Sequence, residues 1–241
     1  MREGNQSKKG NLYLIPTTLG ANAPLEVLPI SIKRTIENID HYIAENEKTA
    51  RRFIKSISTN KSQPSLKFEH LNKFTDPTEI PSYLNPCLDG FDVGLLSEAG
   101  CPGIADPGAD VVRIAHEKKI KVVPLVGPSS ILLALMASGM NGQNFAFNGY
   151  LPIDKNERKN RIKKLERHSR DYQQAQVFIE TPYRNNKLLE EFTKILQPAT
   201  LLCVAAEITL PTEYIVTQPI EEWYTIDLDL HKRPTIFIFQ A

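Results

Sequence analysis

Short apolar runs alternate with helical patterns through the first 150 residues, and this alternation restricts the fold more than any other feature. We expect strands at residues 12–16, 41–44, 93–97, 122–125 and 145–150. The first four are rich in Val, Ile and Leu without regular polar alternation, as in parallel strands covered on both faces. We expect helices at residues 26–39, 47–56, 109–119 and 129–138. The order of strand and helix predicts an α/β fold.

The pattern changes after Leu151-Pro152, where a very polar stretch begins. Beyond it, a helix at residues 184–196 accompanies strands expected at residues 176–180, 201–206, 213–217 and 235–240. Strands this close together, with little helix between them, indicate a mixed and partly antiparallel sheet. We therefore expect two domains: a mostly parallel sheet with flanking helices at residues 11–150, and a mixed α/β sheet at residues 151–241. Residues 1–10 are polar and expected to fray, and residues 58–92 to be irregular with one short helix.

Composition excludes several classes of protein. The 29 Lys and Arg residues nearly balance 28 Asp and Glu, so no overall charge favours nucleic acid or an anionic membrane. The longest apolar run, residues 131–137, is far shorter than the ~20 residues of a membrane span. The N-terminus lacks the apolar region of a signal peptide. Three cysteines and five scattered histidines show no disulfide or metal pattern. We expect a soluble, cytoplasmic protein without a metal.

The stretch Ser-Glu-Ala-Gly-Cys-Pro-Gly-Ile-Ala-Asp-Pro-Gly at residues 97–108 follows an expected strand. Its prolines stiffen the backbone, and its glycines permit conformations and close approaches that a Cβ would forbid. Because α/β sheets bind ligands at the carboxyl ends of their strands, we interpret this stretch as a binding loop. The alternative is a rigid connection in which Asp106 caps the next helix.

Gly127-Pro-Ser-Ser130 ends another expected strand, and Ser129 or Ser130 can cap the following helix. The hydroxyls and free N–H groups there would form a polar surface beside the loop at residues 97–108. These residues can therefore be a helix cap or a ligand site, and both alternatives remain open.

Neither a Gly-x-Gly-x-x-Gly fingerprint nor a Walker A sequence is present, which argues against dehydrogenases and phosphotransferases. Gly127-Pro-Ser-Ser-Ile also lacks the last glycine of a hydrolase elbow.

One segment of the second half is strongly basic. Against Glu157 and Glu166, residues 155–170 contain eight Lys or Arg, at positions 155, 158, 159, 161, 163, 164, 167 and 170. With only Ile162 and Leu165 as an apolar stripe, this helix should show most of its surface to water. The run is either a solvated face or a contact for a phosphate backbone.

Five stretches occur in the order found in the tetrapyrrole methylase superfamily of S-adenosylmethionine-dependent methyltransferases. They are residues 12–21, 97–108, 126–129, 149–152 and 180–184. Over nearly the whole chain beyond residue 10, the sequence resembles most the branch that methylates the ribose 2′-hydroxyl of a cytidine in small-subunit ribosomal RNA. The resemblance implies S-adenosylmethionine as cofactor, folded in the cleft between the two domains, an RNA substrate, and a homodimer. The basic run at residues 155–170 independently favours RNA over a porphyrinoid as the acceptor.

The resemblance also implies roles for single residues. Pro16 would lie under the cofactor, and its methionine part would contact Ala99, Gly100, Cys101, Ile104, Ser129 and Ser130. The adenosine side would be lined by Glu180 or Thr181, Ala206 and Pro234. A ribose hydroxyl would benefit from a general base, for which Glu98, Asp106 and Glu45 remain alternatives.

Three departures from the branch's pattern keep other functions open. Asn46 stands where the branch has an Asp, and Leu210 stands where it has a Lys. Lys48 stands where the branch has an Arg, and a Lys cannot make the bidentate contact of a guanidinium. The leading hypothesis is an RNA ribose methyltransferase. The alternatives are a methyltransferase for a tetrapyrrole or another small molecule, and a catalytically silent module that binds the cofactor or RNA.

Overall fold

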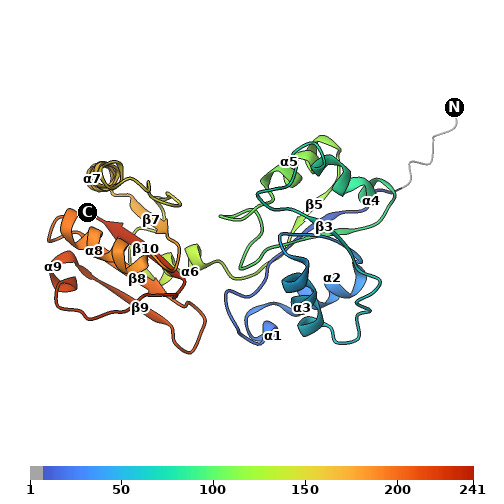
Figure 1. Ribbon diagram of the computed structural model, residues 1–241, viewed down its shortest axis with the longest axis horizontal. Coiled ribbons are helices and arrows are strands. Elements are labelled where there is room, and N and C mark those ends of the chain that lie inside the picture. Colours follow the sequence, from blue (N-terminus) through green and yellow to red (C-terminus); the bar gives the residue numbers. More distant parts are fainter. Residues whose placement is uncertain (1–7) are drawn as a thin grey trace. The chain divides into compact units, whose positions relative to one another are not determined.

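A computed structural model describes residues 8–241, and its contacts divide the chain into two compact units at Pro128/Ser129. Each unit has its own five-stranded sheet (Figure 1). The division falls before the joint expected at residues 150/151. Two elements expected in the first domain belong to the second unit: helix α6 (Ser130–Ser138) packs against its strands, and strand β6 (Phe145–Phe147) pairs with β7 (Ala175–Ile179).

The first unit contains the predicted parallel sheet, with strand order β3-β2-β4-β1-β5. Its strands are β1 (Leu12–Ile15), β2 (His41–Ala44), β3 (Lys67–His70), β4 (Val93–Leu96) and β5 (Val122–Pro124). Successive side chains enter cores on opposite faces: Leu12 and Leu95 pack with helix α5 (Ala109–Glu117), whereas Ile15 and Leu96 pack with α2 (Ile30–Asn38) and α3 (Glu47–Ile57). Figure 1 shows these helices on the two sides of the sheet.

Two expectations for the first unit need correction. The helix expected at residues 26–39 is divided into α1 (Pro24–Val27) and α2, because Pro29 has no N–H for a continuous helix. The region 58–92 contains a 3₁₀ helix (Ile80–Leu84), helix α4 (Asn85–Leu88) and also the edge strand β3. The sequence of β3, Lys-Phe-Glu-His, is polar and mostly exposed, so no apolar run marked it as a strand.

The beginning of the described chain is anchored. Of the ten residues expected to fray, 1–7 lie outside the described residues. The N–H of Gly10 donates to the Cys87 carbonyl oxygen at 2.8 Å, and Lys9 Nζ donates to the Lys118 carbonyl oxygen at 2.7 Å. Gly10 fits there because a Cβ would lie 1.9 Å from the Phe91 carbonyl oxygen. For Lys9 and Gly10, the expectation of fraying was wrong.

The second unit contains the predicted mixed sheet, in the order β6-β7-β10-β8-β9. Only β6 and β7 run parallel, and the remaining pairs are antiparallel. The other strands are β8 (Leu201–Ala206), β9 (Tyr214–Pro219) and β10 (Thr235–Gln240), and the other helices are α7 (Lys155–Tyr172), α8 (Asn185–Ile195) and α9 (Ile220–Trp223). An aromatic core joins Phe178, Phe192, Phe237 and Phe239. No helix within residues 8–241 is long and apolar enough to cross a membrane.

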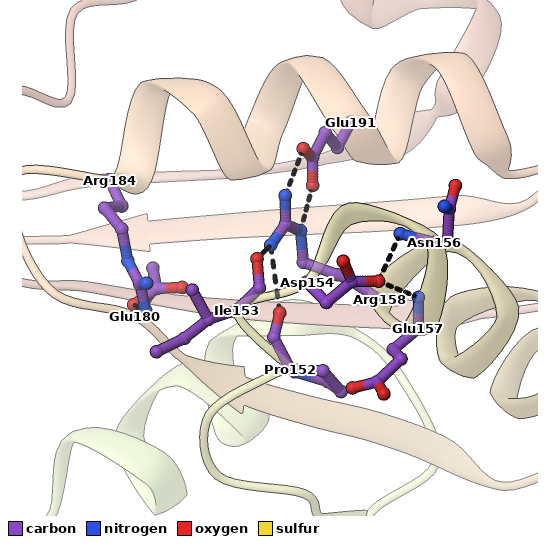
Figure 2. A network of polar contacts seen from close by, with 9 residues as sticks. All are labelled: Pro152, Ile153, Asp154, Asn156, Glu157, Arg158, Glu180, Arg184 and Glu191. Carbon is purple, nitrogen blue, oxygen red and sulfur yellow. Dashed lines mark hydrogen bonds and ion pairs between the residues drawn. The ribbon is translucent and has the colours of Figure 1, made fainter.

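Helix α7 is the basic helix, and it buries more than its two apolar residues. Arg158, Glu166 and Ser169 are buried beside Ile162 and Leu165. The guanidinium of Arg158 makes a bidentate ion pair with Glu191, and its Nη1 donates to the carbonyl oxygens of Pro152 at 2.9 Å and Ile153 at 2.7 Å (Figure 2). Arg158 therefore joins α7, α8 and the segment before α7, and is not part of the exposed basic face.

Candidate functional site

The loops that follow β1, β2, β4 and β5 lie at one edge of the first sheet, because parallel strands end at the same edge. After β1, the N–H of Thr17 donates to the Gly100 carbonyl oxygen at 3.0 Å. After β4, the Cys101 thiol donates to the Pro128 carbonyl oxygen at 3.4 Å. The loop after β4 therefore contacts the loops after β1 and β5, and its role as a binding loop stays a prediction.

Two glycines make these contacts possible. Gly100 has a φ of +74°, and a Cβ there would lie 3.0 Å from Leu19 Cδ2 and 3.1 Å from the Pro128 carbonyl oxygen. At Gly127 a Cβ would lie 2.2 Å from Pro16 Cγ. Side chains at these two positions would push apart the loops after β1, β4 and β5. The two glycines therefore allow close approach of the three loops, which we call the cradle.

The residues predicted for the methionine part of the cofactor differ in exposure. Ala99 and Ile104 are exposed and Cys101 is partly exposed, so they offer surface to a ligand. Pro16 is buried directly beneath Gly127. Ser129 is the N-cap of α6, its hydroxyl accepting from the N–H of Leu132 at 3.4 Å, which confirms the predicted cap, and Ser130 is the first helical residue.

Asp106 is not a helix cap. Helix α5 begins after Gly108, which makes no side-chain cap hydrogen bond, so the alternative in which Asp106 caps that helix was wrong. The pKa of the Asp106 carboxyl is instead raised to about 6, chiefly by burial. The Ser97 hydroxyl opposes this shift by hydrogen bonding, and the charges of Glu45 and Glu98 add to it.

This shift predicts a pH-dependent stability. An unfolded Asp ionises near pH 4 and folded Asp106 near pH 6, so the folded protein holds more protons in that window and its stability falls as pH rises through it. Asp106→Asn removes this loss. Between pH 4.5 and 7.5, we expect the free energy of unfolding of Asp106→Asn to gain on the order of 1 kcal/mol over wild type, a value reduced for the partial exposure of the group.

Differential scanning calorimetry at the two pH values measures this gain. Asp89→Asn is the matched control, because Asp89 is exposed and its replacement removes the same charge without relieving burial. An Asp106→Asn gain that is identical at both pH values would contradict the assignment.

The three candidate bases have different surroundings. The Glu98 side chain is exposed, and the Thr49 hydroxyl lies 2.7 and 3.0 Å from its two carboxylate oxygens. Glu45 is exposed after β2, and Asp106 is half-buried. Within residues 8–241, none of these three carboxylates forms an ion pair. These carboxylates are therefore available to a cationic ligand.

The residues predicted for the adenosine side gather at one edge of the second sheet. Glu180 follows β7, Ala206 ends β8, and Pro234 precedes β10. Thr235 pairs with Ala206, and the N–H of Glu207 donates to the Pro234 carbonyl oxygen at 2.8 Å. The buried Glu180 carboxylate accepts from Thr181 N and Arg184 Nη2, each at 2.6 Å, whereas the Thr181 side chain is exposed.

The loop after β8 has a feature that sequence reasoning missed. Glu207 has a φ of +52° and Thr209 a φ of +75°, conformations that residues with a Cβ rarely adopt. The N–H of Thr209 donates to Glu213 Oε2 at 2.7 Å, and Arg233 Nε donates to Glu207 Oε2 at 2.8 Å. Strained backbone of this kind is concentrated at functional sites. The residue types of this loop do not predict the positive φ angles.

A hollow of about 330 Å³ in the first unit was also missed. It lies beside α3, and its lining includes Thr17, Thr49, Arg52, Phe53 and Glu98. Arg52 and Phe53 read in the sequence as ordinary positions of an amphipathic helix, so only the fold shows that they share a cavity. Among the described residues, no group of three His, Cys, Asp or Glu could hold a metal ion, and all three cysteines are free.

The geometry leaves the roles of the site residues as predictions, including the cofactor site expected in the cleft between the domains. The structure brings together Pro16, Gly100 and Cys101 in one unit, and Glu180, Ala206 and Pro234 in the other.

Comparison with known proteins relates these features to a family. The family model described as Tetrapyrrole (Corrin/Porphyrin) Methylases matches residues 22–223. A protein named ribosomal RNA small subunit methyltransferase I from Escherichia coli O157:H7 is 26% identical over 238 residues, which are 98% of this chain and 79% of that protein. The protein of the same name from Bacillus subtilis (strain 168) is 30% identical over 224 residues, 92% of this chain and 72% of that protein.

Solved structures share the fold. The methyltransferase CobJ matches with a TM-score of 0.64 at 15% identity, covering 96% of this chain and 94% of CobJ. The cobalt precorrin-4 methyltransferase CbiF, a cobalamin biosynthetic enzyme, matches with a TM-score of 0.61 at 14% identity, covering 100% of this chain and 97% of CbiF. At such low identity these structures show the fold alone.

Proposed function

The chain belongs to the family of tetrapyrrole (corrin/porphyrin) methylases and is a methyltransferase, and we propose that it transfers a methyl group from S-adenosylmethionine to a ribose 2′-hydroxyl of small-subunit ribosomal RNA. The observation that carries this proposal is the match, over more than nine tenths of this chain, to relatives named ribosomal RNA small subunit methyltransferase I. We include in the proposal a homodimer in the cytoplasm.

The residues of the first unit fit this cofactor. In the cradle, the backbone at Gly100 approaches Leu19 and the Pro128 carbonyl oxygen more closely than a Cβ would allow, which fixes the position of Ala99, Gly100 and Cys101. S-Adenosylmethionine carries a sulfonium and an ammonium against one carboxylate, so the unpaired Glu45, Glu98 and Asp106 suit its charge. When bound, the cofactor would supply a methyl group on a sulfonium, and the neutral sulfide is the leaving group.

The protein's task is then to position and desolvate the reacting groups. We propose that Ala99, Gly100, Cys101 and Ile104 hold the methionine part, with Pro16 supporting the loop at Gly127 from below. Ser129 and Ser130 would contact the same part from the start of α6. Glu180 or Thr181, Ala206 and Pro234 would line the adenosine side. Glu98, Asp106 and Glu45 remain the candidates for the base.

One departure from the branch's pattern has a structural explanation that supports an active enzyme. Asn46 is the N-cap of α3, and its side-chain oxygen accepts from the N–H groups of Lys48 at 2.9 Å and Thr49 at 3.4 Å. Asn and Asp are equally good N-caps. The change from Asp to Asn therefore preserves the start of this helix and does not by itself indicate a silent module.

The exposed cations of α7 supply a contact for the RNA backbone in this proposal. With Arg158 buried, the other seven Lys and Arg side chains of residues 155–170 are exposed, while Glu166 is buried and accepts from Thr200 Oγ1 and Gln197 N. One buried cation and one buried anion offset each other, so the exposed face keeps the local excess of six positive charges that the sequence count gives. Phosphate groups of RNA would release counterions on binding there.

Reversal of three of these charges tests the contact. We expect Lys159→Glu, Lys163→Glu and Lys164→Glu together to weaken RNA binding more than tenfold and to reduce the slope of log K against log salt by roughly 2 to 3 units. Filter binding of small-subunit ribosomal RNA at several salt concentrations measures both quantities. The matched control reverses Lys55, Lys73 and Lys121, exposed lysines of the first unit. Equal effects of the two triple reversals would rule out a specific contact at α7.

A partition experiment tests the class of acceptor. The purified protein is incubated with S-adenosylmethionine labelled in the methyl group, together with ribosomal RNA, a porphyrinoid mixture or a small-molecule extract. We expect the label in RNA. Label in a porphyrinoid or another small molecule would favour the tetrapyrrole alternative, and cofactor binding without transfer to any fraction would favour the silent module.

A further inference from the structure

The hollow beside α3, hereafter the α3 hollow, has the size and lining of a ligand pocket. Its volume of about 330 Å³ lies within the range of small-molecule sites. Hydroxyl groups contribute much of the lining, through Thr17, Thr18, Thr49, Ser56 and Ser97. A phenyl ring, a guanidinium and a carboxylate complete it, through Phe53, Arg52 and Glu98. This combination suits a ligand with a flat ring, a hydroxylated sugar and a negative charge.

An unsatisfied hydroxyl marks the wall of the α3 hollow. Thr17 is only 6% exposed, and within the described chain its Oγ1 has no hydrogen-bond partner. Buried hydroxyls in proteins are nearly always hydrogen-bonded, because an unpaired one is destabilising. Thr17 lines the α3 hollow, so a polar ligand group there could supply the missing partner.

Two neighbouring arginines of α3 differ in their use. Arg51 is held by the protein: it pairs with Glu47, and it donates to the carbonyl oxygens of Gln63 at 2.5 Å and Leu66 at 3.3 Å. Arg52 is exposed and, among residues 8–241, makes no hydrogen bond or ion pair. No protein group within residues 8–241 therefore pairs with the Arg52 guanidinium, which is free to bind an anion such as phosphate.

Glu98 is oriented from the same helix. The Thr49 hydroxyl, in the first turn of α3, lies 2.9 Å from the Asn46 carbonyl oxygen and 2.7 Å from Glu98 Oε1. Glu98 thereby lines the α3 hollow, while the next residue, Ala99, begins the cradle proposed for the cofactor. One short loop places an oriented carboxylate and the methyl donor's proposed site at consecutive residues.

We infer that the α3 hollow binds the acceptor nucleotide, an inference that rests on the proposed function. The Phe53 ring stacks on the base, and the Arg52 guanidinium binds an adjacent phosphate. Glu98 accepts the proton of the ribose 2′-hydroxyl as its oxygen forms a bond to the methyl carbon. The sulfur–methyl bond breaks in the same step, and its electron pair stays on sulfur.

Steady-state methyl transfer to small-subunit ribosomal RNA tests this assignment with single substitutions in the full chain. We expect Arg52→Gln and Phe53→Leu to raise KM for RNA about tenfold with little change in kcat. Phe53→Leu retains an apolar side chain in a partly buried position, which protects the fold. We expect Glu98→Gln to lower kcat by roughly 10² or more with little change in KM, since a general base acts in the transition state.

Two controls separate this inference from the proposed function. Lys55→Gln removes an exposed cation from α3 outside the α3 hollow and should change KM less than twofold. Calorimetry should give Arg52→Gln, Phe53→Leu and Lys55→Gln the wild-type affinity for S-adenosylmethionine. If Arg52→Gln and Phe53→Leu behave like Lys55→Gln while wild type methylates RNA, the α3 hollow is not the acceptor site, although the proposed function stands.

Direct binding decides the remaining case, in which wild type transfers no methyl to RNA and the proposed function fails. The probe is a fluorescently labelled single-stranded RNA oligonucleotide, followed by anisotropy. Weaker binding by Arg52→Gln and Phe53→Leu than by Lys55→Gln would still place a nucleotide in the α3 hollow. Equal binding by all three variants would overturn the inference.

Discussion

Gly100→Val should abolish detectable binding of S-adenosylmethionine, a loss of at least 100-fold in affinity. The backbone at Gly100 has a φ of +74°, which a β-branched residue adopts only with strain. A Cβ would also lie 3.1 Å from the Pro128 carbonyl oxygen, on the neighbouring loop. Relief of either conflict moves the loop after β4 away from the loop after β5 and opens the cradle. Isothermal titration calorimetry measures the loss.

Gly142→Val is the matched control for this experiment. It introduces the same side chain at a glycine in the second unit where no atom lies within 4 Å of the added Cβ. We expect it to bind the cofactor as wild type does. Circular dichroism and the melting temperature show whether Gly100→Val remains folded. A folded Gly100→Val protein with wild-type affinity would remove the residue 97–108 loop from the cofactor site.

Arg158→Leu should destabilise the second unit by about 3–5 kcal/mol, because it leaves the Glu191 carboxylate without its ion pair in a mostly buried place. The carbonyl oxygens of Pro152 and Ile153 also lose their donor (Figure 2). The chain's only tryptophan, Trp223, lies in the core of this unit, where its Nε1 donates to the Leu202 carbonyl oxygen at 3.1 Å. Urea unfolding followed by tryptophan fluorescence therefore reports on the second unit.

A double-mutant cycle identifies the source of this loss. Arg158→Leu with Glu191→Leu should cost clearly less than the sum of the single substitutions, since removal of both charges leaves neither unpaired. Lys159→Leu, at the next position and exposed, should change stability by less than 1 kcal/mol. Additive losses in the cycle, or equal losses for Arg158 and Lys159, would contradict a buried structural role for Arg158.

Burial pattern explains which parts of the fold could be predicted from the sequence. Strands β2 and β8 lie at residues 41–44 and 201–206, where we expected them, because both are apolar runs bounded by polar residues. The polar edge strand β3 carries no such signal. Strand β6 was recognised but assigned to the first domain, because it follows the strands of that domain in the chain. It pairs instead with β7, the next strand along the chain after α7.

Long-range contacts likewise limited prediction of the candidate site. The loops at residues 97–108 and 126–130 stand out because glycine and proline are concentrated where strands end. The pairing of Arg158 with Glu191 cannot be read from a run of like charges, and so Arg158 was counted with the exposed cations. The α3 hollow combines residues from three segments, 17–24, 49–56 and 97–98. Two of these overlap stretches that stand out in the sequence, but only the fold places α3 beside them.

Identification of the methylated nucleoside tests the central claim most directly. Small-subunit particles that lack the modification are incubated with the protein and methyl-labelled S-adenosylmethionine, and their RNA is digested to nucleosides and separated by liquid chromatography with mass spectrometry. The account predicts that the label appears in one 2′-O-methylnucleoside, with the added mass on the ribose. Label on a base, or RNA without label while a small molecule acquires it, would contradict the account.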